Sequence, residues 1–168
     1  GNTLVGHYAG QDLTCSSSTN GWQNTFIGDS AGANVTTGEV NTYVGYGAGS
    51  TNTSTGKENT FIGGYSGFNI ESGDYITGLG RSGAQNVTTG DNNLLLGYLA
   101  GASSSPGGAI TTASNTITLG NSSIATANIQ VDWTVASDER DKTDFTDLDL
   151  GLNFVNGLKP FTYKWDKR

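Results

Sequence analysis

Asn24-Thr25-Phe26-Ile27-Gly28-Asp29-Ser30-Ala31-Gly32 is the stretch that decides the fold, because close copies of it return along the first two thirds of the chain. Clear copies begin at Asn2, Asn41 and Asn59, and a variant begins at Asn93. All share Asn-Thr or a near equivalent, two apolar residues, Gly, two variable residues, and Ala or Ser before a closing Gly. The chain is therefore a repeat protein with a period of about 17 or 18 residues.

Two weaker copies complete the series. One keeps only the last two residues of the phrase, Ser82-Gly83. The last copy, Asn115–Gly120, has one residue inserted. A second phrase lies between copies: residues 34–38, Asn-Val-Thr-Thr-Gly, recur letter for letter at 86–90. Each repeat unit thus contains two short segments and two turns.

The residue types within a unit predict short strands. Runs rich in Thr, Val, Ile, Phe and Tyr between Gly and Asn are typical of strands bounded by turns, and regular glycine excludes helices. Units this small bury a core only by stacking on their neighbours. We therefore predict an all-β fold, a β-solenoid or β-roll.

Adjacent apolar residues carry a further prediction. Neighbours on a strand point to opposite faces, so Phe26-Ile27 and Phe61-Ile62 each place one side chain inside the coil and one outside. The outward residue needs a partner, most simply another copy of the same chain. This pattern predicts an obligate oligomer.

Composition narrows the classes of partner. The net charge of −7 argues against nucleic acid and anionic membranes, and we expect no membrane insertion. A single Cys15 forms no internal disulfide. The segment Gly78–Gly83 spells G-x-G-x-x-G but falls where a repeat turn is due, so we expect no dinucleotide or other cofactor. His7 alone makes no zinc site, and we expect no metal.

Four tyrosines follow strand glycines and are candidates for ligand binding. They are Tyr8, Tyr46, Tyr65 and Tyr98. Aromatic faces at turns stack on sugar rings, although the same residues also suit ladder packing between coils.

The chain changes character after Gly120. We assign residues 1–123 to the repeat region and 124–136 to a connecting strand, in which Ile129, Val131 and Trp133 alternate with other residues. Further on, the spacing of apolar residues over 148–158 predicts a short amphipathic helix, with Asp147 as a possible N-cap. Phe161, Tyr163 and Trp165 then alternate as in a strand. Residues 137–168 thus predict a small, truncated α/β element.

The motif Ser137-Asp138-Glu139-Arg140-Asp141-Lys142, followed by Leu158, Pro160, Tyr163 and Trp165, resembles the start of the intramolecular chaperone domain of peptidase family S74. That domain stands at the C-terminus of phage tail fibres and tailspikes such as endosialidases. The upstream repeats are also similar to those that precede it. Asp141 departs from the family pattern, which usually has an apolar residue there.

The resemblance implies a homotrimeric fibre whose C-terminal domain assists trimer folding and then cleaves itself off between Ala136 and Ser137. Ser137 is the expected nucleophile and Lys142 the expected general base, with Asp138 or Arg140 in support. Without the resemblance, Ser137-Asp138 reads as a turn or cap. Activity of this copy stays open.

The leading prediction is a structural and adhesive segment of a viral tail fibre in the virion. Its expected partners are its own copies, other tail proteins, and a host cell-surface glycan or protein receptor. One alternative is a trimeric adhesin on a bacterial cell surface. A second alternative is a tailspike that degrades polysaccharide, which needs paired carboxylates that the sparse acids of the repeats do not supply.

Overall fold

The structure is a computed structural model, and it describes residues 1–15, 20–50, 53–131, 133, 152–158 and 162. The chain divides into two units, Gly1–Ala127 and Asn128–Arg168, and each is treated by itself. The first unit carries the repeats. The described part of the second contains one short helix, α1 (Leu152–Gly157), within the segment where the sequence predicts a helix.

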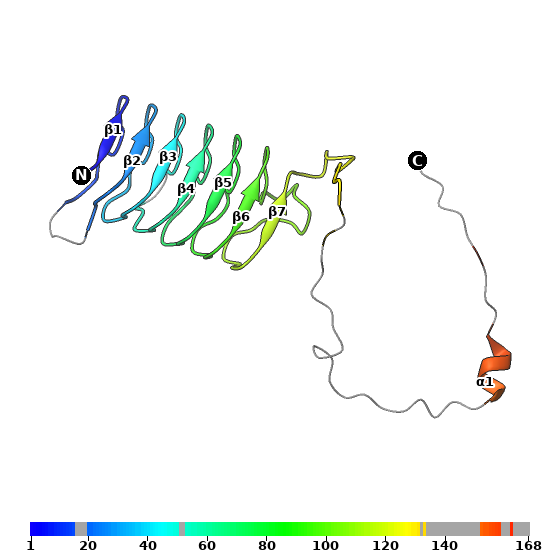
Figure 1. Cartoon of the computed structure of the whole chain (residues 1–168). Helices are drawn as coiled ribbons and strands as arrows, with labels where there is room; N and C mark the ends of the chain where they lie inside the picture. The colour runs from blue at the N-terminus through cyan, green and yellow to red at the C-terminus, as the bar shows by residue number, and fades with distance from the viewer. Residues whose placement is uncertain (16–19, 51–52, 132, 134–151, 159–161, 163–168) are drawn as a thin grey trace. The chain divides into compact units, whose positions relative to one another are not determined.

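The repeats form a β-solenoid with one parallel sheet of seven three-residue strands, arranged in chain order (Figure 1). The strands are β1 (Thr3–Val5), β2 (Thr25–Ile27), β3 (Thr42–Val44), β4 (Thr60–Ile62), β5 (Thr77–Leu79), β6 (Leu94–Leu96) and β7 (Ile117–Leu119). Each coil is numbered below by its strand. Neighbouring strands pair in register, so that Phe26 lies beside Tyr43 and Ile27 beside Val44. The prediction of an all-β solenoid is confirmed.

The middle residue of each strand points into the coil. Phe26, Tyr43 and Phe61 are fully buried and stack face to face, with ring centroids 4.9 Å and 5.0 Å apart. Val35 and Ile70, which lie in the segments between strands, pack in the same core. Stacked rings at the coil spacing therefore replace the large aliphatic core of an ordinary globule.

The glycine after each strand permits the coils to stack closely. Gly45 has φ 134°, and a Cβ on it would lie 2.7 Å from the carbonyl carbon and oxygen of Gly63 in the next coil. No real Cβ tolerates that approach. Both the positive φ and the close backbone of the next coil therefore require glycine at this position.

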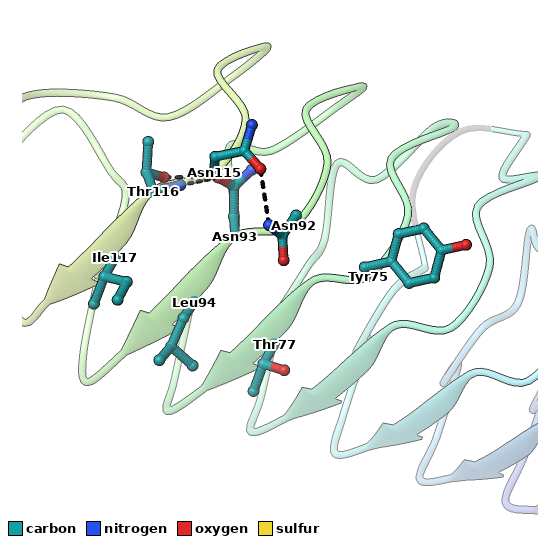
Figure 2. A pocket seen from close by; sticks show the side chains of 8 residues that line it. All are labelled: Tyr75, Thr77, Asn92, Asn93, Leu94, Asn115, Thr116 and Ile117. Carbon is teal, nitrogen blue, oxygen red and sulfur yellow. Dashed lines mark hydrogen bonds between the residues drawn. The ribbon is translucent and has the colours of Figure 1, made fainter.

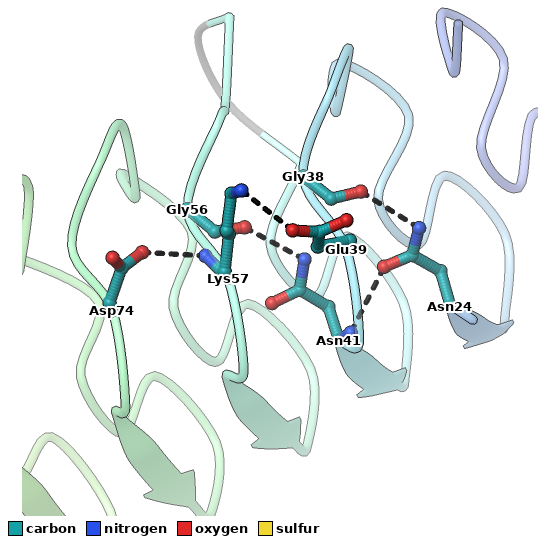
Figure 3. Close-up of polar contacts among 7 residues, drawn as sticks. All are labelled: Asn24, Gly38, Glu39, Asn41, Gly56, Lys57 and Asp74. Carbon is teal, nitrogen blue, oxygen red and sulfur yellow. Dashed lines mark hydrogen bonds and ion pairs between the residues drawn. The ribbon is translucent and has the colours of Figure 1, made fainter. Parts of the chain in front are cut away.

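The asparagine that opens each phrase forms a ladder between coils (Figure 3). Asn41 is fully buried; its backbone N–H donates to Asn24 Oδ1 at 3.0 Å, and its Oδ1 accepts from the backbone N–H of Asn59 at 2.9 Å. Its Nδ2 donates to the carbonyl oxygen of Gly56 at 2.8 Å. The side chain therefore satisfies buried backbone groups in its own coil and in the next.

Coil 5 differs from the expected alignment. The sequence pattern places the closing residue of this coil at Gly83, but the structure places it at Ala84. The backbone N–H of Ala84 donates to the carbonyl oxygen of Ala100, just as the N–H of the closing Gly32 donates to the carbonyl oxygen of Ala48. Ala84 occupies the left-handed closing position at φ 57°. Gly78 lies in β5, so G-x-G-x-x-G is part of the repeat, as predicted.

Coil 7 also shifts by one residue. Its ladder position holds Thr116, whose backbone N–H and Oγ1 both donate to Asn93 Oδ1, at 3.0 Å and 2.7 Å. Asn115, which the sequence pattern places at the start of this copy, stands one position earlier at φ 62°. Asn tolerates that conformation better than most residues.

Residues 124–131 form no strand in this single chain, and Ile129 and Val131 are exposed. Residues 132 and 134–136 lie outside the described residues. The connecting strand over 124–136 and the boundaries at 123 and 136 therefore stay predictions.

Candidate functional site

The four candidate tyrosines occupy two positions in the turn after the strand. Tyr46 and Tyr98 directly follow a strand glycine, whereas Tyr8 and Tyr65 stand one residue later in the left-handed region, at φ 57° and 59°. Three of them are more than half exposed, and Tyr65 is partly buried. A bulky residue in this backbone conformation is uncommon and indicates that the hydrogen bonds between coils hold the turn.

Two of the four tyrosines come together with a third aromatic residue. Tyr46 and Tyr65 meet edge to face with ring centroids 5.1 Å apart, and Tyr65 meets Phe68 at 5.2 Å. They line a hollow of about 340 Å³, here called the turn hollow, together with polar residues that include Ser30 and Asn34. Tyr65 raises the pKa of the Tyr46 phenol, first by hydrogen bonding and then by its charge.

The other two tyrosines lie apart from this cluster. Tyr8 packs against His7, with ring centroids 3.7 Å apart. The guanidinium of Arg81 lies over the ring of Tyr98 at 5.8 Å. The four residues thus do not form one site, and Phe68, which the repeat pattern does not single out, completes the aromatic group that does form.

The turn hollow combines aromatic rings with amide and hydroxyl groups. Aromatic faces suit the apolar faces of sugar rings, and amides and hydroxyls suit sugar hydroxyls. The Asn34 amide is already engaged, because its Nδ2 donates to the carbonyl oxygen of Ser50 at 2.7 Å. Ligand binding by Tyr46 and Tyr65 remains a prediction.

Three acidic residues of the repeats, Glu39, Asp74 and Asp91, contact groups of neighbouring coils. Lys57 Nζ and Glu39 Oε1 form an ion pair at 2.6 Å, which raises the pKa of Lys57 (Figure 3). Asp74 Oδ1 accepts from the backbone N–H of Lys57 at 2.7 Å, and Asp91 Oδ1 accepts from that of Asp74 at 2.9 Å. These two carboxylates are thus held by backbone groups of neighbouring coils.

Within the described part of the chain, no three His, Cys, Asp or Glu residues gather as a metal site would require. The same residues include no helix long and apolar enough to cross a bilayer.

The outer face of the sheet carries a regular row of apolar side chains. The third residue of every strand is aliphatic and points outward, and these residues are here called the aliphatic column. Its members are Val5, Ile27, Val44, Ile62, Leu79, Leu96 and Leu119. Five of them are 36% to 55% exposed, and the other two are half-buried. The predicted division of each apolar pair into an inward and an outward residue is confirmed.

A second hollow lies on this face at coils 5 to 7 (Figure 2). It measures about 400 Å³ and is here called the strand hollow. Thr77, Leu94 and Ile117 lie along the strands beside it, and Tyr75, Asn92 and Asn115 belong to the turns before those strands. The sequence pattern predicts none of these residues as a binding residue.

The residues expected to cleave the chain, Ser137 and Lys142, lie outside the described residues, as do Ala136, Asp138 and Arg140. The geometry of that site is therefore not part of the structure, and its chemistry stays a prediction.

Comparison with known proteins gives one result for this segment. A family model described as Peptidase_S74, chaperone of endosialidase, matches residues 137–168. This supports the resemblance drawn from Ser137–Lys142 and the residues after it. The match does not extend to the solenoid. No curated protein and no solved structure matches the chain.

Proposed function

We propose that this chain is a shaft segment of a homotrimeric viral tail fibre, followed by the start of a domain that assists folding of the trimer. One observation carries the proposal: a solenoid with an unpaired aliphatic column precedes, along the chain, a segment that matches the chaperone of endosialidase. A contiguous row of exposed apolar side chains is a feature of interaction surfaces. Self-association covers it with surface of the same repeat spacing.

The oligomer test is direct. Light scattering coupled to size-exclusion chromatography should give three times the mass of the 168-residue chain. Gold-labelled antibodies against the solenoid should then decorate virion tails in electron micrographs. A folded monomer at micromolar concentration contradicts the trimer, and labelling of a bacterial envelope in place of virions favours the alternative of a cell-surface adhesin.

Attachment to the host is the adhesive part of this proposal. The turn hollow lies after the strands rather than on the outer face, so association of outer faces need not cover it. Its aromatic residues fit a host cell-surface glycan. A glycan array with the wild type should give hits that weaken at least about tenfold for Tyr46→Ala, as expected when a stacking aromatic is removed.

Tyr98→Ala is the matched control, because Tyr98 occupies the same turn position outside the hollow. Equal loss in both variants would reject the turn hollow as the glycan contact. An array without hits would reject glycan attachment through this segment and leave a protein receptor.

Self-cleavage is the second activity that we propose for residues 137–168. The Ser137 hydroxyl attacks the Ala136 carbonyl carbon while the Lys142 amine takes the hydroxyl proton. The peptide bond breaks as its nitrogen gains a proton, and water then hydrolyses the ester. The products are a carboxylate at Ala136 and an amino terminus at Ser137.

A matched pair of lysines makes the cleavage test specific. In the full-length protein, mass spectrometry should find a fragment ending at Ala136. Ser137→Ala and Lys142→Met should abolish it, whereas Lys164→Met should retain it. Cleavage that survives Ser137→Ala, or an uncut full-length wild type, would reject this chemistry.

A further inference from the structure

The outer face is not uniform along the solenoid. The first residue of the strand also points outward, and it is threonine in β1 through β5. In β6 and β7 the same position holds Leu94 and Ile117, and Ile117 is 65% exposed. At these two coils both outward residues of the strand are therefore aliphatic. The apolar surface widens from one column to two at one end of the sheet.

The strand hollow lies at this widened end. Ile117 is exposed along it and Leu94 is half-buried, and the ring of Tyr75, which is 57% exposed, stands on the turn side (Figure 2). Asn92 and Asn115 are nearby, with Asn92 Nδ2 donating to Asn115 Oδ1 at 2.8 Å. An apolar floor with a polar rim is the usual anatomy of a protein interface.

From this asymmetry we infer that β6 and β7 form a registration patch, where copies of the chain first associate and their parallel alignment is fixed. The inference rests on the proposed trimer and names the surface that starts it. The occupant is a second copy of the same solenoid, with its sheet packed on the outer face.

Register is the problem that the patch solves. The aliphatic column repeats at every coil, so two copies displaced by one coil would still match along most of its length. Such repeating surfaces specify register weakly. Leu94 and Ile117 break the repetition, because a displaced copy would place one of them against the threonine column.

The chemistry of the face also favours identical copies. Both outward columns consist of Thr, Val, Ile and Leu, so parallel association brings no like charges together. Toward the C-terminus, the patch is followed by the segment matched to the chaperone family. Toward the N-terminus, the apolar surface narrows from two columns to one between β6 and β5. Association from the patch would therefore proceed toward the N-terminal coils.

The chain itself supplies a fold-compatible test, because threonine already occupies the first strand position in five coils. The double variant Leu94→Thr/Ile117→Thr removes the patch and leaves the inward residues in place. The matched control Val5→Thr/Ile27→Thr removes two outward aliphatic residues at the opposite end. All three full chains are refolded from urea, and light scattering and sedimentation velocity follow assembly.

Circular dichroism first establishes that each variant contains the β-structure of the wild type. We expect the patch variant to assemble at least about tenfold more slowly, with a broadened sedimentation boundary from misaligned copies. The control should assemble within about twofold of the wild-type rate, because its loss lies far from the patch.

The outcomes separate the two proposals. A wild-type trimer whose two double variants assemble alike overturns the registration patch and leaves the proposed fibre function intact. A monomeric wild type overturns both. Oligosaccharide binding that disappears in the patch variant while assembly is unchanged would also overturn the inference, since the strand hollow would then be a ligand site.

Discussion

Replacing Asn41 with alanine tests whether the buried ladder stabilises the solenoid. Asn41 Oδ1 accepts from the backbone N–H of Asn59 at 2.9 Å, and its Nδ2 donates to the carbonyl oxygen of Gly56 at 2.8 Å. Both partner residues are buried. Asn41→Ala therefore leaves one donor and one acceptor without partners in the interior of the coil.

The expected loss follows from these two groups. A buried polar group without a partner costs about 1–3 kcal/mol, so for two such groups the free energy of unfolding should fall by about 2–6 kcal/mol. That is a large share of the total stability of a domain, which is of the order of 5–15 kcal/mol. Urea unfolding followed by circular dichroism measures it, at equal protein concentrations because association adds to apparent stability.

Two further variants locate the cause. Asn34→Ala removes one hydrogen bond, from Nδ2 to the carbonyl oxygen of Ser50, at a partly buried position and should cost about 1 kcal/mol. Asn41→Leu restores most of the side-chain volume without the hydrogen bonds and should lose nearly as much stability as Asn41→Ala. Equal losses for Asn34→Ala and Asn41→Ala, or wild-type stability in Asn41→Leu, would refute the role of the ladder.

Three other substitutions probe the interior of the coils by the same unfolding measurement. Gly45→Ala should cost at least about 3 kcal/mol, because its Cβ would meet the backbone of Gly63, and an unchanged midpoint would contradict the close stacking. Tyr43→Phe should add about 1 kcal/mol, because the buried hydroxyl has no hydrogen-bond partner among the described residues. Burial raises the pKa of Tyr43 above 10.0, so the wild type should lose further stability as the pH rises past about 10, and Tyr43→Phe should lose stability less steeply there. Gly78→Phe should destabilise the solenoid, because even a Cβ at position 78 would lie 2.9 Å from the Cβ of Ala84. Adding Ala84→Gly should recover part of the lost stability, and strictly additive effects of the two substitutions would contradict the contact.

Much of the fold follows from adjacent residue types. The pair Phe26-Ile27 predicts one buried and one outward side chain, and the structure places Phe26 at 0% and Ile27 at 40% exposure. Strand periodicity alone supplies this result. The ladder does not follow from periodicity, although Asn41 stands at a recurring position, because its partners belong to other coils and depend on register.

The candidate sites were less predictable for a related reason. Each tyrosine was identified from its place in one repeat, whereas a binding site joins residues from several coils. Tyr46 and Tyr65 meet because they belong to adjacent coils, and Phe68 joins them from a position after the closing glycine. Tyr8 and Tyr98 belong to coils distant from these two and have other neighbours.

Coil 5 shows how the repeats vary without losing the fold. It carries Ile76 in place of the ladder asparagine, Gly78 in place of an inward aromatic, and Ala84 in place of a closing glycine. The last two changes are coupled, since a Cβ on Gly32 would lie 2.6 Å from the ring of Phe26. Without a ring at position 78, the Ala84 methyl group fits.

A change of one inward residue in a coil is thus matched by a change of another inward residue that it contacts. The outward residues contact no inward residue and are free of this constraint. A side chain on the outer face meets no residue of the coil interior, so packing of that interior does not require it to be apolar. The third strand position is nevertheless aliphatic in every coil, including coil 5, where the interior changes most. Packing of the coil interior does not account for this column, and the proposed association of copies through their outer faces would bury it.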